Sequence, residues 1–305
     1  MPHIPKLSVV IPVHNEQDTV QELAARIAEV VSSHYELIFV DDGSTDETWQ
    51  RLLQLHRADQ VRLLRLRKRF GKTAALMAGF SLIRGETVLT LDGDLQDDPA
   101  EIPRFLAKLE EGYDLVTGWK KRRRDPVTKV VSSRLFNFAV RRMTGLGLRD
   151  INCGFKALRG EAARALHIHG EMHRFIPVLM AAQGFRVGEI EVTHHPRRHG
   201  LSKYGFERMF KGFFDLVTVV LLTRFRERPA HGFGLVALAS LGTALLVLAA
   251  STIFGSAAGL LVVLAAVLAV SGVVFLAAGW ATEYVVALGG GGSQLAYYSV
   301  REKLD

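Results

Sequence analysis

Apolar and polar positions change period repeatedly along residues 7–117. Short apolar runs of strand-like composition are followed by segments in which apolar residues recur every three or four positions, the pattern of an amphipathic helix. This order predicts an α/β domain with a mostly parallel sheet. The expected strands are residues 7–13, 36–41, 61–66, 87–91 and 114–117, and the expected helices are residues 17–32, 45–56, 72–84 and 99–110.

The C-terminal part has a different pattern. No charged residue occurs between Gly232 and Thr282, and the apolar stretches 233–254 and 260–281 are each long enough to cross a bilayer core of about 30 Å. Arg and Lys flank this pair on both sides, whereas the connection at residues 255–259 carries no charge. By the positive-inside rule, the sequence predicts a two-helix transmembrane hairpin with both flanks in the cytoplasm. Two buried core helices are the alternative.

Two further stretches, residues 127–144 and 206–222, mix apolar with basic or polar positions. Such helices lie in the headgroup region of a membrane. The net charge is +7, and the residues from Pro229 onward hold two Lys or Arg against three acids. The positive charge therefore belongs to the N-terminal part, which indicates an anionic partner such as lipid phosphates. The expected parts are residues 1–205, 206–228 and 229–305.

Polar clusters follow three of the predicted strands at their carboxyl ends, where open parallel sheets bind ligands. One of them contains Asp92, Asp94 and Gln96, which supply two carboxylates and an amide oxygen. Mg²⁺ and Mn²⁺ take such ligands and complete their shells with water and substrate phosphates, so the cluster predicts a divalent cation and a diphosphate substrate. A plain acidic turn is the alternative.

The cluster at residues 41–46 combines two expectations. Asp41 and Asp42 are predicted to contact a ligand. Ser44 and Glu47 are predicted instead to form a capping box at the start of the following helix. Cys153 is the single cysteine, so no intrachain disulfide can form, which fits a catalytic part on the reducing side of a membrane.

Six motifs in order carry a family resemblance. The first three resemble the family 2 glycosyltransferases of the GT-A fold, a Rossmann-like fold with a mostly parallel sheet. The last three are similar to the polyprenyl-phosphate glycosyltransferases, namely the dolichol-phosphate mannose synthase group and its bacterial two-span relatives. The motifs are Pro12-Val-His-Asn-Glu16, Asp41-Asp-Gly-Ser-Thr-Asp46, Asp92-Gly-Asp-Leu-Gln-Asp-Asp-Pro99, Asn152-Cys-Gly-Phe-Lys156, His173-Arg-Phe-Ile-Pro177 and His194-His-Pro-Arg-Arg-His-Gly-Leu-Ser-Lys-Tyr204.

The resemblance implies roles for individual residues. It places a nucleoside near the first two clusters and the metal and diphosphate on Asp92, Asp94 and Gln96. The expected nucleotide-sugar contacts are Pro12, Val13, Glu16, Asp41, Asp42, Lys72, Asp92, Arg197 and Lys203. The expected catalytic residues are Asp94, Asp150, Arg197 and Lys203, with Arg197 and Lys203 closing over the diphosphate.

Two of these assignments have open alternatives or a weaker basis. Asp150 is the nearest candidate for a catalytic aspartate before the Gly-Phe-Lys segment, but its role is alternatively only to fix the loop at residues 147–153. Lys129, Ser133 and Arg134 are candidates for the acceptor phosphate because of their place on the amphipathic segment.

The expected activity is an inverting, metal-dependent transfer of one sugar to polyprenyl or undecaprenyl phosphate on the cytoplasmic face, for glycan or cell-envelope modification. Mg²⁺ or Mn²⁺ is the expected cofactor. A UDP-hexose such as UDP-glucose is the expected donor, with GDP-mannose as the alternative. The expected partners are the donor, the lipid and the bilayer, with no nucleic acid; an oligomer formed through the two spans is a further hypothesis.

Four other interpretations are weaker. A processive polysaccharide synthase would carry a Gln-x-x-Arg-Trp segment, which is absent. A phosphate loop around Gly71-Lys-Thr73 requires a glycine where the chain has Leu66. His194, His195 and His199 lack the carboxylate and helix context of a zinc site. An inactive membrane scaffold that retained the fold remains the alternative from a different class.

Overall fold

The structure is a computed structural model of the chain. It describes residues 5–31, 34–56, 60–121, 127–196, 207–225, 228–253, 258–288 and 300–304. The chain divides into two compact units, which are described separately. Unit 1 comprises Met1–Val219 and Ala296–Asp305, and unit 2 comprises Val220–Leu295.

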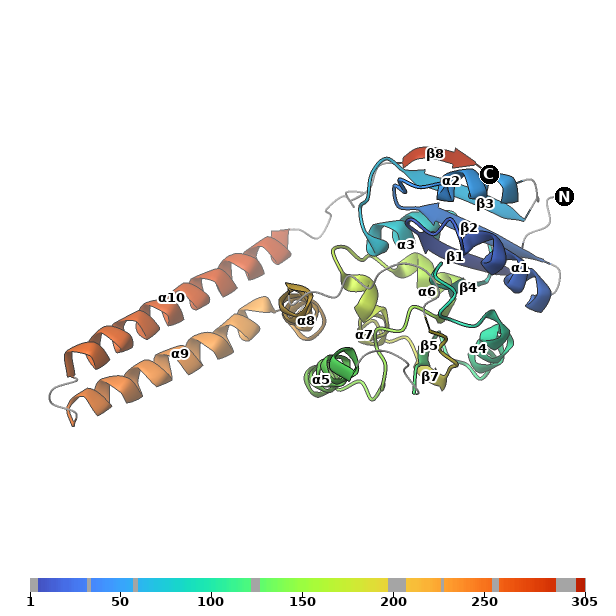
Figure 1. Cartoon of the computed structure of the whole chain (residues 1–305). Helices are drawn as coiled ribbons and strands as arrows, with labels where there is room; N and C mark the ends of the chain where they lie inside the picture. Colours follow the sequence, from blue (N-terminus) through green and yellow to red (C-terminus); the bar gives the residue numbers. More distant parts are fainter. Residues whose placement is uncertain are drawn as a thin grey trace. The chain divides into compact units, whose positions relative to one another are not determined.

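Unit 1 is built on one eight-stranded sheet with the order β7-β5-β6-β4-β1-β2-β3-β8 (Figure 1). Parallel pairs join β4, β1, β2 and β3 in the centre, and a further parallel pair joins β5 to β7; the pairs made by β6 and β8 are antiparallel. The strands are β1 Leu7–Val13, β2 Tyr35–Asp41, β3 Val61–Leu66, β4 Thr87–Thr90, β5 Leu115–Trp119, β6 Lys156–Arg159, β7 Val187–Glu191 and β8 Val300–Leu304.

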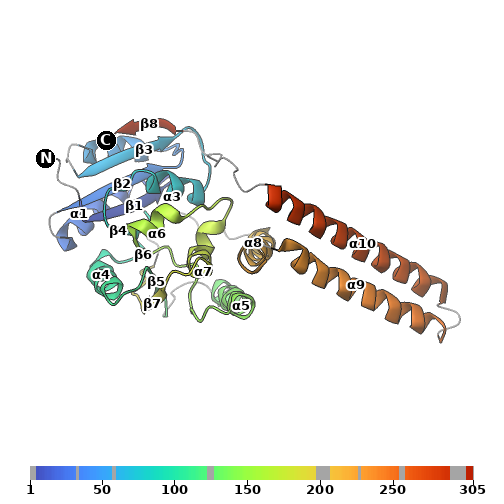
Figure 2. The same ribbon diagram turned by 180° about the vertical axis from the view of Figure 1, so that it is seen from behind.

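Helices cover both faces of this sheet. Helices α1, α2 and α4 lie on one face, and α3, α6 and α7 lie on the other, which Figure 2 shows from behind. The helical elements of unit 1 are α1 Val20–Val30, α2 Thr48–Leu55, α3 Lys72–Phe80, η1 Pro99–Glu101, α4 Ile102–Glu110, α5 Val127–Thr144, α6 Gly160–Ala165, η2 Met172–Phe175, α7 Ile176–Ala182 and α8 Glu207–Arg224, whose last turn belongs to unit 2.

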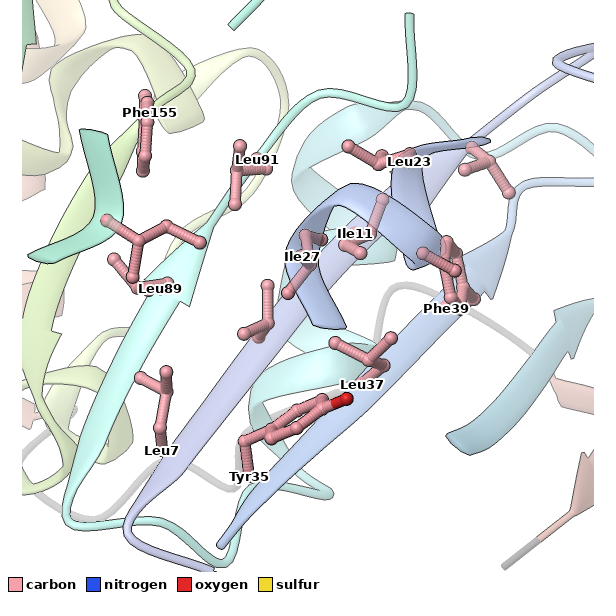
Figure 3. Close-up of a cluster of buried hydrophobic side chains, with 14 of the residues drawn as sticks. Leu7, Ile11, Leu23, Ile27, Tyr35, Leu37, Phe39, Leu89, Leu91 and Phe155 are labelled. Atoms are coloured by element: carbon pink, nitrogen blue, oxygen red, sulfur yellow. The ribbon is translucent and has the colours of Figure 1, made fainter. Parts of the chain in front are cut away.

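The core explains why the central strands are apolar throughout. Alternate residues of β1, β2 and β4 point to the face covered by α1 and pack against Leu23 and Ile27 of that helix (Figure 3). The intervening residues are also buried, for example Val10, which lies so close to α3 that a β-carbon added at Gly79 would overlap it. Strands buried on both faces are typical of parallel sheets, and the predicted α/β class is confirmed.

Unit 2 is a helical hairpin of α9 Pro229–Ser251 and α10 Ala258–Leu288. Small residues let the helices approach closely: a β-carbon added at Gly272 would lie 2.7 Å from Cγ of Leu241, and one added at Gly279 would lie 2.8 Å from Cβ of Phe233. Most leucine and valine side chains point outward instead. Both helices are long and apolar enough to span a membrane, and both extend beyond the predicted spans 233–254 and 260–281 toward the charged flanks.

The last strand, β8, returns to unit 1 and was not predicted. It pairs antiparallel with β3, for example Leu304 with Leu63. The chain therefore leaves unit 1 before the hairpin and rejoins the same sheet after it.

Candidate active site

Three polar clusters meet at the carboxyl ends of β4, β1 and β2. These strands are neighbours in the sheet and all run parallel, so the predicted adjacency of the clusters is confirmed. Hydrogen bonds join the first two clusters: the Asn15 backbone N–H donates to Ser44 Oγ at 2.9 Å, and the Glu16 N–H donates to Thr48 Oγ1 at 2.8 Å. This edge of the sheet, at the carboxyl ends of β4, β1 and β2, is called the rim below. It is held by contacts between loops that are distant in the sequence.

The predicted capping box at Ser44 and Glu47 is wrong. Helix α2 begins at Thr48, and neither Glu47 nor Ser44 caps it through its side chain. Instead, Asp46 Oδ1 accepts the N–H of Thr48 at 3.0 Å. The Ser44 hydroxyl is used by Asn15, because the two loops lie side by side at the rim.

The two aspartates that end β2 are engaged within the fold. Asp41 is fully buried; its Oδ1 accepts the Ser44 N–H at 2.9 Å, and its Oδ2 lies 3.3 Å from Arg65 Nε. Asp42 accepts the N–H groups of Phe70 and Gly71 at 2.6 and 2.9 Å, and burial raises its pKa despite these bonds. Both carboxylates therefore stabilise the backbone of the loops at the rim.

Three further predicted nucleotide contacts, Pro12, Val13 and Glu16, lie on or just after β1. Val13 is buried, whereas Pro12 and Glu16 are half-buried. A carboxylate oxygen of Glu16 accepts from the Thr19 hydroxyl at 3.1 Å. Gly93, between the two acids of the third cluster, packs against Val13 and Glu16. The first and third clusters are therefore in contact.

Asp92 is the centre of the third cluster and forms an ion pair with Lys72, the first residue of α3. About a third of the Asp92 side chain is exposed, at 33%. Burial raises the pKa of this carboxyl, but the ammonium groups of Lys72, Lys120 and Lys156 outweigh that effect and hold the pKa well below its ordinary value. Asp92 is therefore ionised at neutral pH and accessible.

Asp94 and Gln96 follow Asp92 on the same loop and are both half-buried. Oδ1 of Asp94 accepts the Gln96 N–H at 3.2 Å. The Gln96 side-chain Nε2 donates to the carbonyl of His195 at 3.3 Å and lies 3.4 Å from His194 Nε2. The side-chain amide nitrogen of Gln96 is therefore engaged by the 194–195 segment.

These residues fit a hard divalent cation. Asp92 is ionised, Asp94 adds a second carboxylate, and Gln96 adds an amide oxygen. In the part of the chain that the structure describes, no three His, Cys, Asp or Glu side chains converge as a complete cage, and His194 and His195 form no metal cluster. A cation here would therefore take further ligands from substrate phosphates and water, as Mg²⁺ commonly does. His199 lies outside the described residues.

A second layer of charges lies behind Asp92 and was not predicted. Lys120 Nζ is 2.7 Å from Oδ1 of buried Asp97, and the Lys156 ammonium donates to the carbonyl of Cys153. Burial lowers the pKa of Lys156 to about 8 and raises that of the Cys153 thiol to about 12. Asp97, Cys153 and Lys156 lie in two of the motifs singled out above, which was the available signal. The proximity of Cys153 and Lys156 to Asp92 depends on the pairing of β6 with β4.

Asp150 is buried beside this layer. Its Oδ2 accepts the Lys120 N–H at 3.4 Å, and its own N–H donates to Oε1 of Glu189 at 2.8 Å. The latter bond belongs to a turn that also ties the Arg149 N–H to Glu189. These contacts fix the loop, and the catalytic role predicted for Asp150 stays a prediction.

The three acceptor-phosphate candidates lie on α5. Ser133 is half-buried and Arg134 is exposed, whereas the side chain of Lys129 is outside the described residues. Helix α5 packs on the domain through the side that carries Phe136, whose ring lies 5.6 Å from that of Phe175 in η2. At about 100° per residue, Ser133 lies on this packed side and Arg134 lies away from it. Arg197 and Lys203, predicted to close over the diphosphate, are also outside the described residues.

Comparison with known proteins gives consistent relatives. Residues 8–166 match the model of the family described as glycosyl transferase family 2. The chain is 40% identical over 252 residues to a dodecaprenyl-phosphate galacturonate synthase of Rhizobium johnstonii, covering 80% of this chain and 75% of the relative. It is 35% identical over 292 residues to an undecaprenyl-phosphate 4-deoxy-4-formamido-L-arabinose transferase of Klebsiella pneumoniae. This match covers 93% of this chain and 89% of the relative.

Among solved structures, the chain resembles glucosyl-3-phosphoglycerate synthase from Mycobacterium tuberculosis, crystallised with Mn²⁺, UDP-glucose and phosphoglyceric acid. The TM-score is 0.56 at 23% identity, over 71% of this chain and 79% of the other. At this identity the likeness shows the fold, and it confirms the GT-A architecture expected for unit 1.

Proposed function

Because the chain belongs to glycosyl transferase family 2, we propose that it transfers one sugar from a nucleotide sugar to a polyprenyl phosphate in a membrane. The two curated relatives described above are named for transfer to such lipids, and both matches extend beyond the family-model region. The observation that carries the proposal is Asp92 at the carboxyl end of β4, an accessible and ionised carboxylate that pairs with Lys72 and is followed on the same loop by Asp94 and Gln96.

The site suits departure of a nucleoside diphosphate. A bound Mg²⁺ or Mn²⁺ would supply positive charge where the leaving diphosphate gains negative charge. Asp92, Asp94 and Gln96 would hold this cation. Lys72 adds a fixed ammonium at the same place, and preorganised charges of this kind stabilise the transition state more than the bound substrate.

The acceptor brings its own nucleophile. A phosphate monoester has its second pKa near 6, so it is largely dianionic at neutral pH and needs little help from a general base. Attack by its oxygen on the anomeric carbon, opposite the departing diphosphate, breaks the bond to the donor and inverts that centre. Lys129, Ser133 and Arg134 on α5 remain our candidates for holding this phosphate.

The donor is proposed to be a UDP-sugar, with UDP-glucose as the first candidate and GDP-mannose as the alternative. The relatives are named for galacturonate and 4-deoxy-4-formamido-L-arabinose, so the corresponding UDP-sugars belong in the same panel. A solved structure of the same fold holds Mn²⁺ with UDP-glucose, which supports these as first probes.

The hairpin is proposed to anchor the chain with unit 1 in the cytoplasm. Arg224 and Arg228 precede α9, and Arg301 and Lys303 follow α10 in β8. Because β8 pairs within the sheet of unit 1, both ends of the hairpin connect to the same unit, which supports both flanks being on one side of the bilayer. Helices α5 and α8 expose Phe138 and Phe214, in keeping with a location at the lipid surface.

The test is transfer of radiolabelled sugar to undecaprenyl phosphate in detergent. The donor panel contains UDP-glucose, UDP-galacturonate, UDP-4-deoxy-4-formamido-L-arabinose and GDP-mannose, each with Mn²⁺, with Mg²⁺ and with a chelator. A chelator-sensitive lipid product from one donor is expected, and the Asp94→Asn chain should form about 10²-fold less of it. Absence of product from every donor by a folded chain would favour the inactive scaffold.

A further inference from the structure

Gly154 lies directly against the carboxylate of Asp92. A β-carbon added at Gly154 would lie 2.6 Å from Oδ2 of Asp92 and 2.7 Å from both Cγ and Oδ1. Because the three distances are nearly equal, the α-carbon of Gly154 faces the flat side of the carboxylate. The lone pairs of the Asp92 oxygens point within the plane of the carboxylate, where Lys72 binds one oxygen and a cation could bind.

The backbone on both sides of Gly154 is held by side chains. The ammonium of Lys156 donates to the carbonyl of Cys153, and the hydroxyl of Thr90 donates to the carbonyl of Gly154 at 2.7 Å. Thr90 and Lys156 are register partners on β4 and β6, and both are buried. The two peptide groups that flank the Gly154 α-carbon are therefore fixed from the sheet itself.

The next residue adds a third attachment. Phe155 is fully buried, its ring stacks on Phe105 with centroids 4.1 Å apart, and its carbonyl accepts the Gly118 N–H at 3.0 Å. With residues 153–155 held in this way, a methyl group at position 154 cannot be relieved by the backbone. The Asp92 carboxylate, at the end of a side chain that is one-third exposed, is the part that yields.

We propose that Gly154 is a positioning residue for the cation-binding carboxylate of Asp92. This inference rests on the proposed function in taking Asp92 as a cation ligand. Gly154 lies against one face of the carboxylate and sets its plane. Lys72, from α3, forms an ion pair with one of its two oxygens. The residue at position 154 acts through Asp92 and touches neither substrate nor reacting atoms.

The size of the displacement decides the effect. Ordinary contacts of a β-carbon begin at about 3.4 Å, so relief of the overlap moves the carboxylate by about 0.7 Å. Ligand distances in metal sites vary by only about 0.2 Å. Outer-layer substitutions of this kind typically cost about 10- to 100-fold in metal affinity. Global stability should change little, because the overlapped atoms are the end of a partly exposed side chain.

The experiment compares Gly154→Ala with Gly188→Ala in the full-length chain. A β-carbon at Gly188 would overlap the ring of Tyr113 at 2.8 Å, so this control introduces a similar side-chain overlap on β7, outside the site. Binding of Mn²⁺, alone and with UDP, is measured by electron paramagnetic resonance, and Tm is measured in parallel. Gly154→Ala is expected to bind Mn²⁺ about 10- to 100-fold more weakly at a Tm within a few degrees of the control, which binds as the unsubstituted chain does.

Unchanged Mn²⁺ affinity in a folded Gly154→Ala chain would overturn the proposal. If that chain fails to fold, Thr90→Val removes the bond to the Gly154 carbonyl without changing side-chain shape, and a several-fold loss of Mn²⁺ affinity is expected. Its control is Thr117→Val on β5, whose hydroxyl has no hydrogen-bond partner among the described residues. Equal affinities in these two variants would also overturn the proposal.

The readout separates this inference from the proposed function. If the unsubstituted chain binds Mn²⁺ and Gly154→Ala binds it more weakly, the positioning role stands even if no donor in the panel yields a lipid product. If the unsubstituted chain binds no Mn²⁺ with or without UDP, Asp92 is not a cation ligand under these conditions and the positioning role is refuted.

Discussion

At the residue scale, substitution of Lys72 tests whether the positive charges around Asp92 increase kcat. We expect Lys72→Met to lower kcat by about 10²-fold with a much smaller change in KM, because a fixed ammonium stabilises the charge that develops on the leaving diphosphate. Lys72→Arg keeps the charge and should retain more activity. Steady-state rates with the donor that the panel identifies give both constants. A rise in KM alone would show that Lys72 contributes to substrate binding only.

His173 gives a pH prediction at the same scale. Its Nδ1 lies 2.9 Å from the Thr73 hydroxyl, and burial, together with Lys72 and Arg174, lowers its pKa well below 6.5. The unfolded chain takes up a proton below about pH 6.5 and the folded chain does not, so stability falls as the pH falls through this value.

The matching experiment follows Tm in detergent from pH 7.5 to 5.5. We expect His173→Gln to lose less stability over this interval than the unsubstituted chain. The exposed His167→Gln is the control and should follow the unsubstituted chain. Parallel curves for all three chains would mean that His173 does not contribute to the acid sensitivity.

The site residues differ in how far the sequence alone predicts them. Asp92, Asp94 and Gln96 were predictable because they follow one apolar run directly, and a strand end is a local signal. Gly154 and Lys156 were not, since they meet Asp92 only because β6 inserts antiparallel between β4 and β5. That pairing joins residues about 65 positions apart, and no local pattern specifies it.

At the element scale, the start of α9 depends on an acid from α10. Oε2 of Glu283 accepts the N–H of Ala230 at 3.0 Å, in the first turn of α9. The first N–H groups of a helix have no partner within it, and a carboxylate is favoured there by the helix dipole. Glu283 is thus a cap supplied by the neighbouring helix.

Removing this cap should weaken the hairpin. We expect Glu283→Ala to lower the free energy of unfolding of the hairpin by about 1 kcal/mol, the usual cost of losing an N-terminal cap. The stability of Glu283→Gln should lie between those of Glu283→Ala and the unsubstituted chain. Thr282→Val is the control, because its hydroxyl bonds only to Ala278 of the same helix among the described contacts. Thermal unfolding in detergent measures the difference, and equal values for Glu283→Ala and Thr282→Val would contradict the capping role.

Element prediction succeeded where the pattern was long or sharply bounded. Strands β1 and β3 and helix α5 have the predicted bounds. Strands β6, β7 and β8 were missed because, unlike β4 and β5 of the same length, they lie outside the regular strand–helix alternation of residues 7–117, and β8 carries Arg301, Glu302 and Lys303 in a row. An edge strand beside polar solvent needs no apolar alternation, so its sequence resembles a charged tail.

At the scale of the whole molecule, the proposed transmembrane hairpin and β8 together predict which parts share a side of the membrane. If α9 and α10 both cross the membrane, as proposed, the chain returns to the side on which it started, and the pairing of β8 with β3 is compatible only with that arrangement. Together with the positive flanks, this predicts that the turn between α9 and α10 lies on the opposite face, away from the cytoplasm.

Single introduced cysteines test this arrangement, because the native Cys153 is buried and should react little. Ile253→Cys places a thiol just after α9 at an exposed position, and Glu110→Cys places one at the exposed end of α4. With intact spheroplasts and a membrane-impermeant maleimide, only Ile253→Cys should be labelled, and Glu110→Cys should require permeabilisation. Labelling of both in intact spheroplasts would mean that unit 1 lies outside, where a nucleotide-sugar donor made in the cytoplasm does not reach it.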